Sequence, residues 1–279
     1  MFNAKQIAVL VLIAVLVTAL FSLNIKGLQK EEASKPTTDA KEQAVVAISL
    51  EQVSKTAKQT INASLAAEIT SLETALKNAD EQSKLALYKQ LALKWDDVNV
   101  AIPSAFYKEL VAQTESSYEN WVLAGDQLTT AYQTTQDSTI QPTLVQKAIT
   151  AYQSALKLNP GSLNAKTGLG TAYVSGTPNP MQGITLLLEV VKQDPKNVKA
   201  NTNLGLFAMR SGQFDKAVTR FKTVIEQKPD PEAWFYLATS YENLGQNKDA
   251  ILAYEKSKEL AAEPGLSNFV DQKIKALKK

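Results

Sequence analysis

Hydrophobic residues recur at helical spacing along most of this chain, after an uninterrupted apolar segment near its start. Residues 6–25 are uncharged and lie between Lys5 and Lys26. As a helix they would rise about 30 Å, which matches the hydrocarbon core of a bilayer. We therefore expect residues 1–26 to form a membrane-spanning anchor, and a cleaved signal peptide is the alternative.

Two features of the sequence disagree about the side of the membrane on which the body lies. Lysine counting slightly favours the cytoplasm, because Lys26, Lys30 and Lys35 follow the apolar segment. An N-terminal apolar segment ahead of a hydrophilic body is, however, the usual layout of a signal-anchor with an exported body. We expect a single-pass membrane protein with a periplasmic or other extracytoplasmic body, and a cytoplasmic orientation stays open.

The next part of the chain predicts a polar linker followed by a helical hairpin. Residues 27–42 are polar and lack apolar periodicity, which favours a flexible linker. From Ala44 to about Lys77 the apolar spacing predicts one long helix without Gly or Pro. Two more helices, the second of them N-capped by Ser104, complete a hairpin region over 43–117.

The long helix at 44–77 also raises the alternative of a homodimer. A parallel coiled coil through this helix would join two copies of the chain. Thr56, Gln59 and Thr60 interrupt the hydrophobic heptads. The dimer is therefore kept as an alternative and not as the leading interpretation.

The second half of the chain repeats one pattern of large and small residues. The last three copies follow one another at intervals of 35 and 33 residues, and the first copy is more divergent. The four copies contain Trp121-x2-Ala124-Gly125-x2-Leu128 with Ala148-x3-Tyr152, Leu169-Gly170-x2-Tyr173 with Gly183-x3-Leu187, Leu204-Gly205-x2-Ala208 with Ala217-x3-Phe221, and Trp234-x2-Leu237-Ala238-x2-Tyr241 with Ala250-x3-Tyr254.

This pattern resembles the tetratricopeptide repeat (TPR), in which W-x2-L-G-x2-Y on one helix is followed by A-x3-F on the next and by a proline. The resemblance implies an all-α fold, an α-solenoid of about three to four helix pairs. The array would cover 118–279, with repeats at about 118–162, 163–197, 198–230 and 231–264. Residues 265–279 would form a C-terminal capping helix.

The resemblance also implies a function, since TPR arrays generally bind partner proteins or peptides on a surface lined by the first helix of each pair. On that mapping the partner-binding groove contains Asn164, Thr171, Lys199, Asn203, Leu206, Arg210, Phe235, Tyr236, Thr239 and Asn243, together with Glu119, Asp126, Thr167, Thr202 and Glu232.

One specific TPR activity is not predicted. Some TPR adaptors clamp a C-terminal carboxylate with Lys and Asn side chains at fixed positions of the first helices. Thr167 and Thr171 stand where the first Lys and Asn would be, and Phe235 and Tyr236 occupy the last repeat. Arg210 is the best single candidate for a partner contact, although a merely solvated arginine is the simpler interpretation.

Composition removes most catalytic chemistries. The 279 residues include no Cys and no His, which excludes Ser-His and Cys-His catalysis and nearly all zinc, copper and haem sites. Lys and Arg number 30 against 28 acidic residues, so the chain lacks the basic excess of a nucleic-acid-binding protein.

We therefore predict a protein that is not an enzyme and has no catalytic residues, cofactor or metal site. The leading interpretation is a membrane-anchored TPR scaffold in the cell envelope that binds a protein or peptide but no nucleic acid. A structural homodimer built on 44–77 and an accessory factor of an envelope enzyme are the alternatives.

Overall fold

The computed structural model describes residues 48–261 and 264–278. The predicted anchor at 1–26 and linker at 27–42 lie outside these residues. Among the helices that the structure describes, none combines the length and the hydrophobicity needed to cross a bilayer.

The described residues form α-helices joined by short turns, with one 3-10 turn and no β-strand. The elements are α2 (Leu50–Ala57), η1 (Lys58–Thr60), α3 (Ala63–Lys77), α4 (Glu81–Asp97), α5 (Ala101–Thr114), α6 (Tyr118–Thr134), α7 (Gln141–Leu158), α8 (Leu163–Gly176), α9 (Pro180–Gln193), α10 (Val198–Arg210), α11 (Phe214–Gln227), α12 (Pro231–Asn243), α13 (Asn247–Ala261) and α14 (Pro264–Leu277).

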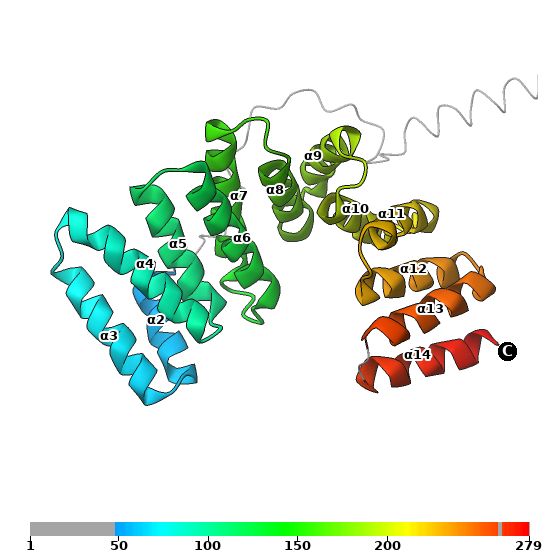
Figure 1. Ribbon diagram of the computed structural model, residues 1–279, viewed down its shortest axis with the longest axis horizontal. Coiled ribbons are helices and arrows are strands. Elements are labelled where there is room, and N and C mark those ends of the chain that lie inside the picture. The colour runs from blue at the N-terminus through cyan, green and yellow to red at the C-terminus, as the bar shows by residue number, and fades with distance from the viewer. Residues whose placement is uncertain (1–47, 262–263, 279) are drawn as a thin grey trace, which may run out of the picture. The chain divides into compact units, whose positions relative to one another are not determined.

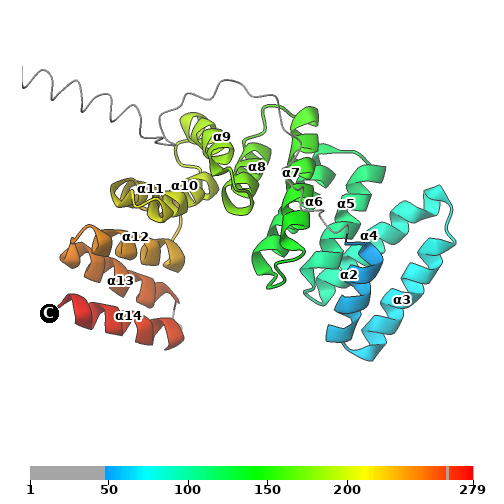
Figure 2. The same cartoon turned by 180° about the vertical axis from the view of Figure 1, so that it is seen from behind.

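Consecutive helices pack as pairs, and the pairs stack in chain order (Figure 1). The first helices of successive pairs, α6, α8, α10 and α12, contact one another, while each second helix also contacts the first helix of the next pair. The view from behind in Figure 2 shows the same succession. The chain therefore has the all-helical, TPR-like solenoid fold that the repeat pattern predicts.

In each helix pair, a small residue on the first helix packs against a large residue on the second helix. A Cβ atom on Gly125 would come within 2.8 Å of the Tyr152 ring, and one on Gly205 would come within 2.8 Å of the Phe221 ring. The two helices of a pair approach closely because the first helix presents no side chain at this point. The loss of a side chain on one helix is matched by full burial of an aromatic residue on the other.

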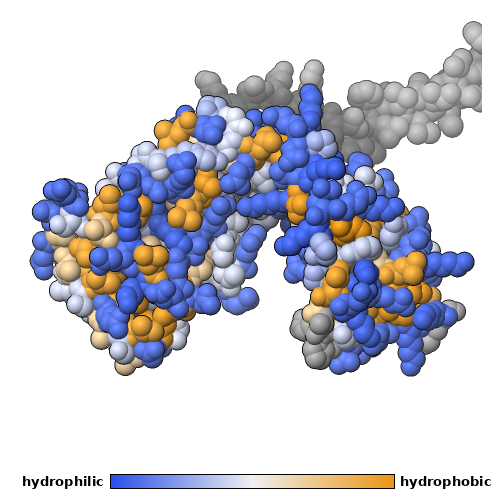
Figure 3. All heavy atoms as spheres, viewed as in Figure 1, coloured by the Kyte–Doolittle hydropathy of each residue, from blue (hydrophilic) through white to orange (hydrophobic). Residues whose placement is uncertain are grey.

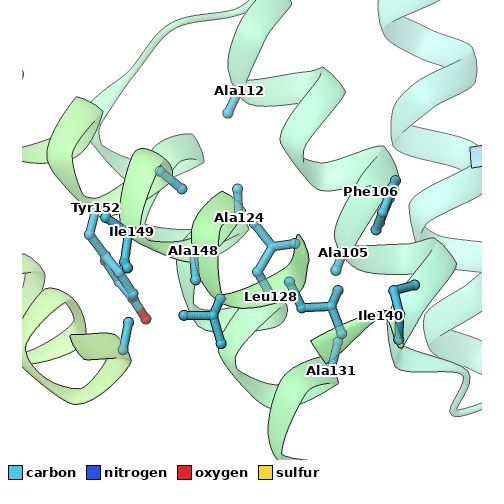
Figure 4. Packing of buried hydrophobic residues seen from close by; sticks show 14 of the residues in the cluster. Ala105, Phe106, Ala112, Ala124, Leu128, Ala131, Ile140, Ala148, Ile149 and Tyr152 are labelled. Atoms are coloured by element: carbon cyan, nitrogen blue, oxygen red, sulfur yellow. The ribbon is translucent and has the colours of Figure 1, made fainter. Parts of the chain in front are cut away.

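One hydrophobic core crosses residue 117, where we expected the hairpin region to end. Ala105 and Phe106 of α5 pack in the same cluster as Leu128 of α6 and Ile140 (Figure 4). Helix α5 thus packs on α6 as α7 packs on α8. The helices before residue 117 therefore continue the stack.

The long helix predicted over 44–77 is broken, so this prediction is wrong. The Thr60 hydroxyl donates to the Ala57 carbonyl, Ile61 is extended, and the Asn62 side chain accepts the backbone N–H of Leu65 to start α3. Side chains that bond the local backbone compete with the helical hydrogen bonds and favour ends and caps. The coiled coil that would have joined two copies has no continuous helix here.

Helices α4 and α5 form one more pair of the repeat type, which the sequence analysis missed. Tyr88-x2-Leu91-Ala92-x2-Trp95 stands 33 residues before the corresponding Trp121 pattern. Leu91 and Trp95 are fully buried, as the large residues of the pattern require. Because Tyr88 and Ala92 replace the more diagnostic Trp and Gly, the match was weak in the sequence.

The turn between α4 and α5 supports this assignment. Asn99 has a φ of 57°, and Gly212 and Gly245, at the same place in later repeats, have φ values of 72° and 70°. In all three turns this residue and its successor donate backbone hydrogen bonds to carbonyls three and five residues earlier, respectively. Asn is the residue besides Gly that most readily adopts this left-handed conformation.

Ser104 is not the N-cap of α5, contrary to our expectation. The helix begins earlier, at Ala101, and Pro103 lies in its first turn, where a missing N–H breaks no helical hydrogen bond. Ser104 is fully buried and donates its hydroxyl to the Asp96 carboxylate.

We predict that Gly183→Ala destabilises the protein, although Ala normally stabilises a helix relative to Gly. A Cβ at Gly183 would overlap the backbone oxygen of Gly170, which no rotamer change can relieve. Urea unfolding followed by far-UV circular dichroism should show a loss of about 1–3 kcal/mol.

Gly161→Ala is the matched control for this experiment. A Cβ at Gly161 meets only the Asn159 side chain, at 3.8 Å, so its unfolding curve should stay close to that of the wild type. Equal stability of Gly183→Ala and the wild type would contradict the close approach of α8 and α9.

Candidate functional site

A pocket of about 290 Å³ opens between the first helices α8 and α10. Its walls come from the C-terminal end of α8 and from the middle and C-terminal end of α10, and three of the predicted groove residues contribute to it. The lining residues are Val174, Ser175, Asn203, Leu206, Met209 and Arg210. We call this cavity the α8–α10 pocket.

Most of the predicted groove residues are accessible, but Thr171 is not. Asn164, Lys199, Arg210 and Asn243 are exposed, and Asn203, Leu206, Phe235, Tyr236 and Thr239 are half-buried. Thr171 and Thr167 are each only 2 % exposed, and the Thr171 hydroxyl donates to the Thr167 carbonyl at 2.8 Å. Their assignment to an accessible groove surface is therefore wrong.

An ion pair joins α6 and α10, the first helices on either side of α8. Lys199 on α10 lies 3.3 Å from the Asp126 carboxylate on α6, and α8 lies between these helices in the stack. Asp126 also accepts the Tyr152 hydroxyl at 2.7 Å. Lys199 is thus accessible but already paired, which the sequence alone did not indicate.

Two buried tyrosines of the second helices each contact one acidic residue and one threonine of the first helix. The order of the acid and the threonine along the first helix is reversed between the two repeats. Tyr152 donates to Asp126 and lies 3.4 Å from the Thr129 hydroxyl. Tyr254 donates to Glu242 at 2.6 Å and lies 3.2 Å from the Thr239 hydroxyl. Each acid and threonine are three residues apart on one helix face, so either order satisfies a buried hydroxyl.

The two repeats between those of Tyr152 and Tyr254 need no acidic residue on the first helix at the corresponding position. Leu187 and Phe221 take the place of the tyrosines and carry no hydroxyl. The facing positions on α10 are Leu206 and Met209, which line the α8–α10 pocket instead. The groove is therefore apolar at its centre because no buried hydroxyl requires a polar partner at that point.

Glu242 links three helices at the C-terminal end of the array. Besides accepting from Tyr254, it accepts from Lys273 of α14 at 2.9 Å. Burial raises the pKa of the Glu242 carboxyl, but the hydrogen bonds from Tyr254 and Lys273 outweigh burial and leave the pKa below its ordinary value. Burial and the Glu242 carboxylate raise the pKa of Tyr254, which keeps its proton and acts as a donor.

Arg210 stands at the mouth of the α8–α10 pocket. Its Nη2 donates to the Val174 carbonyl at 3.3 Å, and its guanidinium carbon lies 5.9 Å from the centre of the Phe207 ring. Within 48–261 and 264–278 it forms no ion pair. The chain's other arginine, Arg220, donates to the Asn201 side chain at 3.0 Å.

Aromatic residues of the last repeat continue the groove beyond this pocket. The ring centres of Phe235 and Tyr236 lie 6.1 Å apart, and those of Phe235 and Phe269 lie 5.9 Å apart. Phe269 of α14 is 47 % exposed, whereas Leu266, Val270, Ile274 and Leu277 of the same helix pack into the core cluster. Figure 3 shows hydrophobic atoms gathered over these C-terminal helices.

A second, more polar pocket of about 660 Å³ lies where the missed repeat meets α6. It is lined by the polar residues Asp96, Asn99, Lys108, Gln127, Thr130, Thr134 and Thr135, together with the apolar residues Val100, Ala101 and Ile102. Lys108 forms an ion pair with Asp96 at 2.8 Å. The Tyr88–Trp95 pattern was the sequence signal that would have indicated the additional α4–α5 repeat beside this pocket.

Comparison with protein families identifies part of the array. Residues 202–264 match the tetratricopeptide repeat family. This segment covers most of α10 and all of α11–α13, so the family match falls on the last two helix pairs of the array. No curated protein matches the chain significantly.

Solved structures resemble the chain only distantly. A crystal structure of MamA has a TM-score of 0.47 and 20 % identity, covering 63 % of this chain and 91 % of that one. YrrB, described as a TPR protein with an unusual peptide-binding site, has a TM-score of 0.46 and 17 % identity over 72 % of this chain and 97 % of that one. Likenesses at this level carry no argument about function.

We predict that Glu242→Gln reduces the acid sensitivity of the protein. A folded-state pKa below the ordinary value of 4.5 stabilises the protein above that pH, and this contribution disappears as pH falls through the lowered pKa. Thermal melts at pH 7 and at about pH 3.5 should show a smaller loss of Tm for Glu242→Gln than for the wild type.

Glu226→Gln is the control, since Glu226 is exposed on α11 and forms no ion pair with a described residue. An identical loss of Tm on acidification in wild type and Glu242→Gln would mean that the Glu242 contacts contribute nothing to stability.

Proposed function

We propose that this protein is a membrane-anchored TPR scaffold that binds a partner protein or peptide along α6, α8, α10 and α12. The observation that carries the proposal is the α8–α10 pocket, formed by first-helix side chains of successive repeats. Its α10 wall belongs to the segment that matches the tetratricopeptide repeat family. A groove of side chains on a rigid helical stack suits recognition of an extended segment.

The anchor and the cell-envelope location are part of the same proposal and rest on the sequence. The uncharged residues 6–25 are long enough to span a bilayer as a helix. An anchored array would hold its partner close to the membrane surface, and the periplasmic or extracytoplasmic side is the one we favour. An envelope enzyme that uses this protein as an accessory factor would be one such partner.

A scaffold is favoured over a structural homodimer because of the break at Ile61 and Asn62. The dimer needed an uninterrupted helix over 44–77, and α2 and α3 are instead separated by a capped break. The hydroxyl of Ser54 on α2 donates to Glu73 on α3, so the two helices fold back on each other.

We predict that a photocrosslinking amino acid at Asn203 captures a partner protein in cells. Asn203 lines the α8–α10 pocket, whereas Lys216 is exposed on α11, a second helix of its pair. Mass spectrometry should identify a product that forms from position 203 and not from position 216.

Two other results would count against the proposal. Equal capture from both positions would mean that the first-helix surface is not the binding site. Capture of nothing but a second copy of this chain would favour the homodimer.

Membrane orientation has a simple test because the chain contains no Cys. A single cysteine introduced in place of exposed Lys216 should react in intact cells with a membrane-impermeant maleimide that reaches the periplasm. Deletion of residues 1–26 should release the protein from the membrane fraction in an alkaline wash. Labelling only after cell lysis would place the array in the cytoplasm and contradict the export that we propose.

A further inference from the structure

The first helices α6, α8, α10 and α12 carry three cations, and two of them are paired within the protein. Lys166 of α8 pairs with Glu189 of α9, and Lys199 of α10 pairs with Asp126 of α6. Both pairs connect different helices of the stack. Arg210 differs, because no carboxylate of the described residues lies within ion-pair distance of it.

The guanidinium of Arg210 has unused donors at the α8–α10 pocket. Arginine offers five N–H donors, and the described residues accept only one, at the Val174 carbonyl and at the long distance of 3.3 Å. Its planar fork is the side chain that best matches a carboxylate, through two parallel hydrogen bonds. The mouth of the pocket is therefore complementary to a negative charge.

The walls of the same pocket are complementary to an apolar side chain. Val174, Leu206 and Met209 line it, and unbranched Met adapts to ligands of different shape. Asn203 donates its amide nitrogen to the Lys199 carbonyl at 2.8 Å, which leaves its amide oxygen to accept a hydrogen bond. A peptide N–H is a donor that would fit there.

Aromatic side chains stand on the next first helix along the stack. Helix α10 contacts α12, which carries Phe235 and Tyr236, and half-exposed Phe269 packs beside Phe235. A segment that leaves the α8–α10 pocket towards the C-terminal repeats meets this apolar surface next.

We propose that the partner segment is an extended acidic–hydrophobic peptide. An Asp or Glu side chain pairs with Arg210, a neighbouring Leu, Met or Val fills the α8–α10 pocket, and a further large apolar residue packs on Phe235 and Phe269. This inference rests on the proposed function, because it assigns the chemistry of the segment that the groove binds. It differs from a carboxylate clamp, since the acid is a side chain within the segment.

The test is a selection of random 12-residue peptides, displayed with blocked C-termini, on the full-length protein in lipid nanodiscs. Selected peptides should be enriched in Asp or Glu next to large apolar residues. Arg210→Glu should weaken the best peptide by at least about tenfold, as expected for a charge-assisted hydrogen bond. A selection on Arg210→Glu should enrich Lys or Arg in place of the acid.

Lys216→Glu is the matched control, since it makes the same charge change on exposed α11. It should bind the selected peptides as the wild type does. A second comparison uses the best acidic peptide and a version in which Asn or Gln replaces its acid. The wild-type protein should bind the acidic peptide more tightly than this neutral version, whereas Arg210→Glu should show no such preference. Equal weakening by Arg210→Glu and Lys216→Glu would indicate general charge attraction and overturn the inference.

Asn203→Trp separates failure of this inference from failure of the proposed function, because the larger side chain fills the pocket. Peptides that lose binding with Asn203→Trp but not with Arg210→Glu would support the groove and overturn the acidic specificity. Peptides that are unaffected by both changes, or a selection that yields no binder, would overturn both proposals. Circular dichroism melts of each variant establish that the repeats remain folded.

Discussion

The close approach of the two helices in each repeat is the constraint on which the rest of this structure depends. At Gly125, Gly170 and Gly205 the first helix presents no side chain, and a large residue of the second helix fills that place. The burial of Tyr152, Leu187 and Phe221 follows from this arrangement. Once a pair is joined, its outer faces are apolar and require a neighbouring pair, so the array grows by stacking.

This packing determines the chemistry of the groove. A buried tyrosine hydroxyl needs a hydrogen-bond partner, and for Tyr152 and Tyr254 the facing positions of the first helix supply it. Asp126 and Glu242 occupy those positions where the second helix carries a tyrosine. Leu206 and Met209 occupy them where it carries Phe221, and they form the apolar floor of the α8–α10 pocket. The alternation of polar and apolar regions along the groove is thus a consequence of what each second helix buries.

Ion pairs between helices then determine which cations remain available to bind a partner. Lys199 has the position and exposure of a binding residue, but it is already paired with Asp126 of α6. Lys273 likewise belongs to the contact between α14 and Glu242. Arg210 keeps free donors because Val174 offers it only a backbone carbonyl. The partner chemistry we propose follows from this difference between otherwise similar cations.

Local sequence determined the all-helical class, the four C-terminal helix pairs and the first-helix location of Asn203, Leu206 and Arg210, because small and large residues at fixed spacing leave few ways to pack. The tertiary structure decided what depends on contacts between distant residues. It buried Thr171 beneath neighbouring helices, paired Lys199 with a residue 73 positions away, and made α4 and α5 a further repeat despite their weak pattern. Spacing along one helix determines which residues share a face, whereas accessibility and pairing depend on which other helices lie over that face.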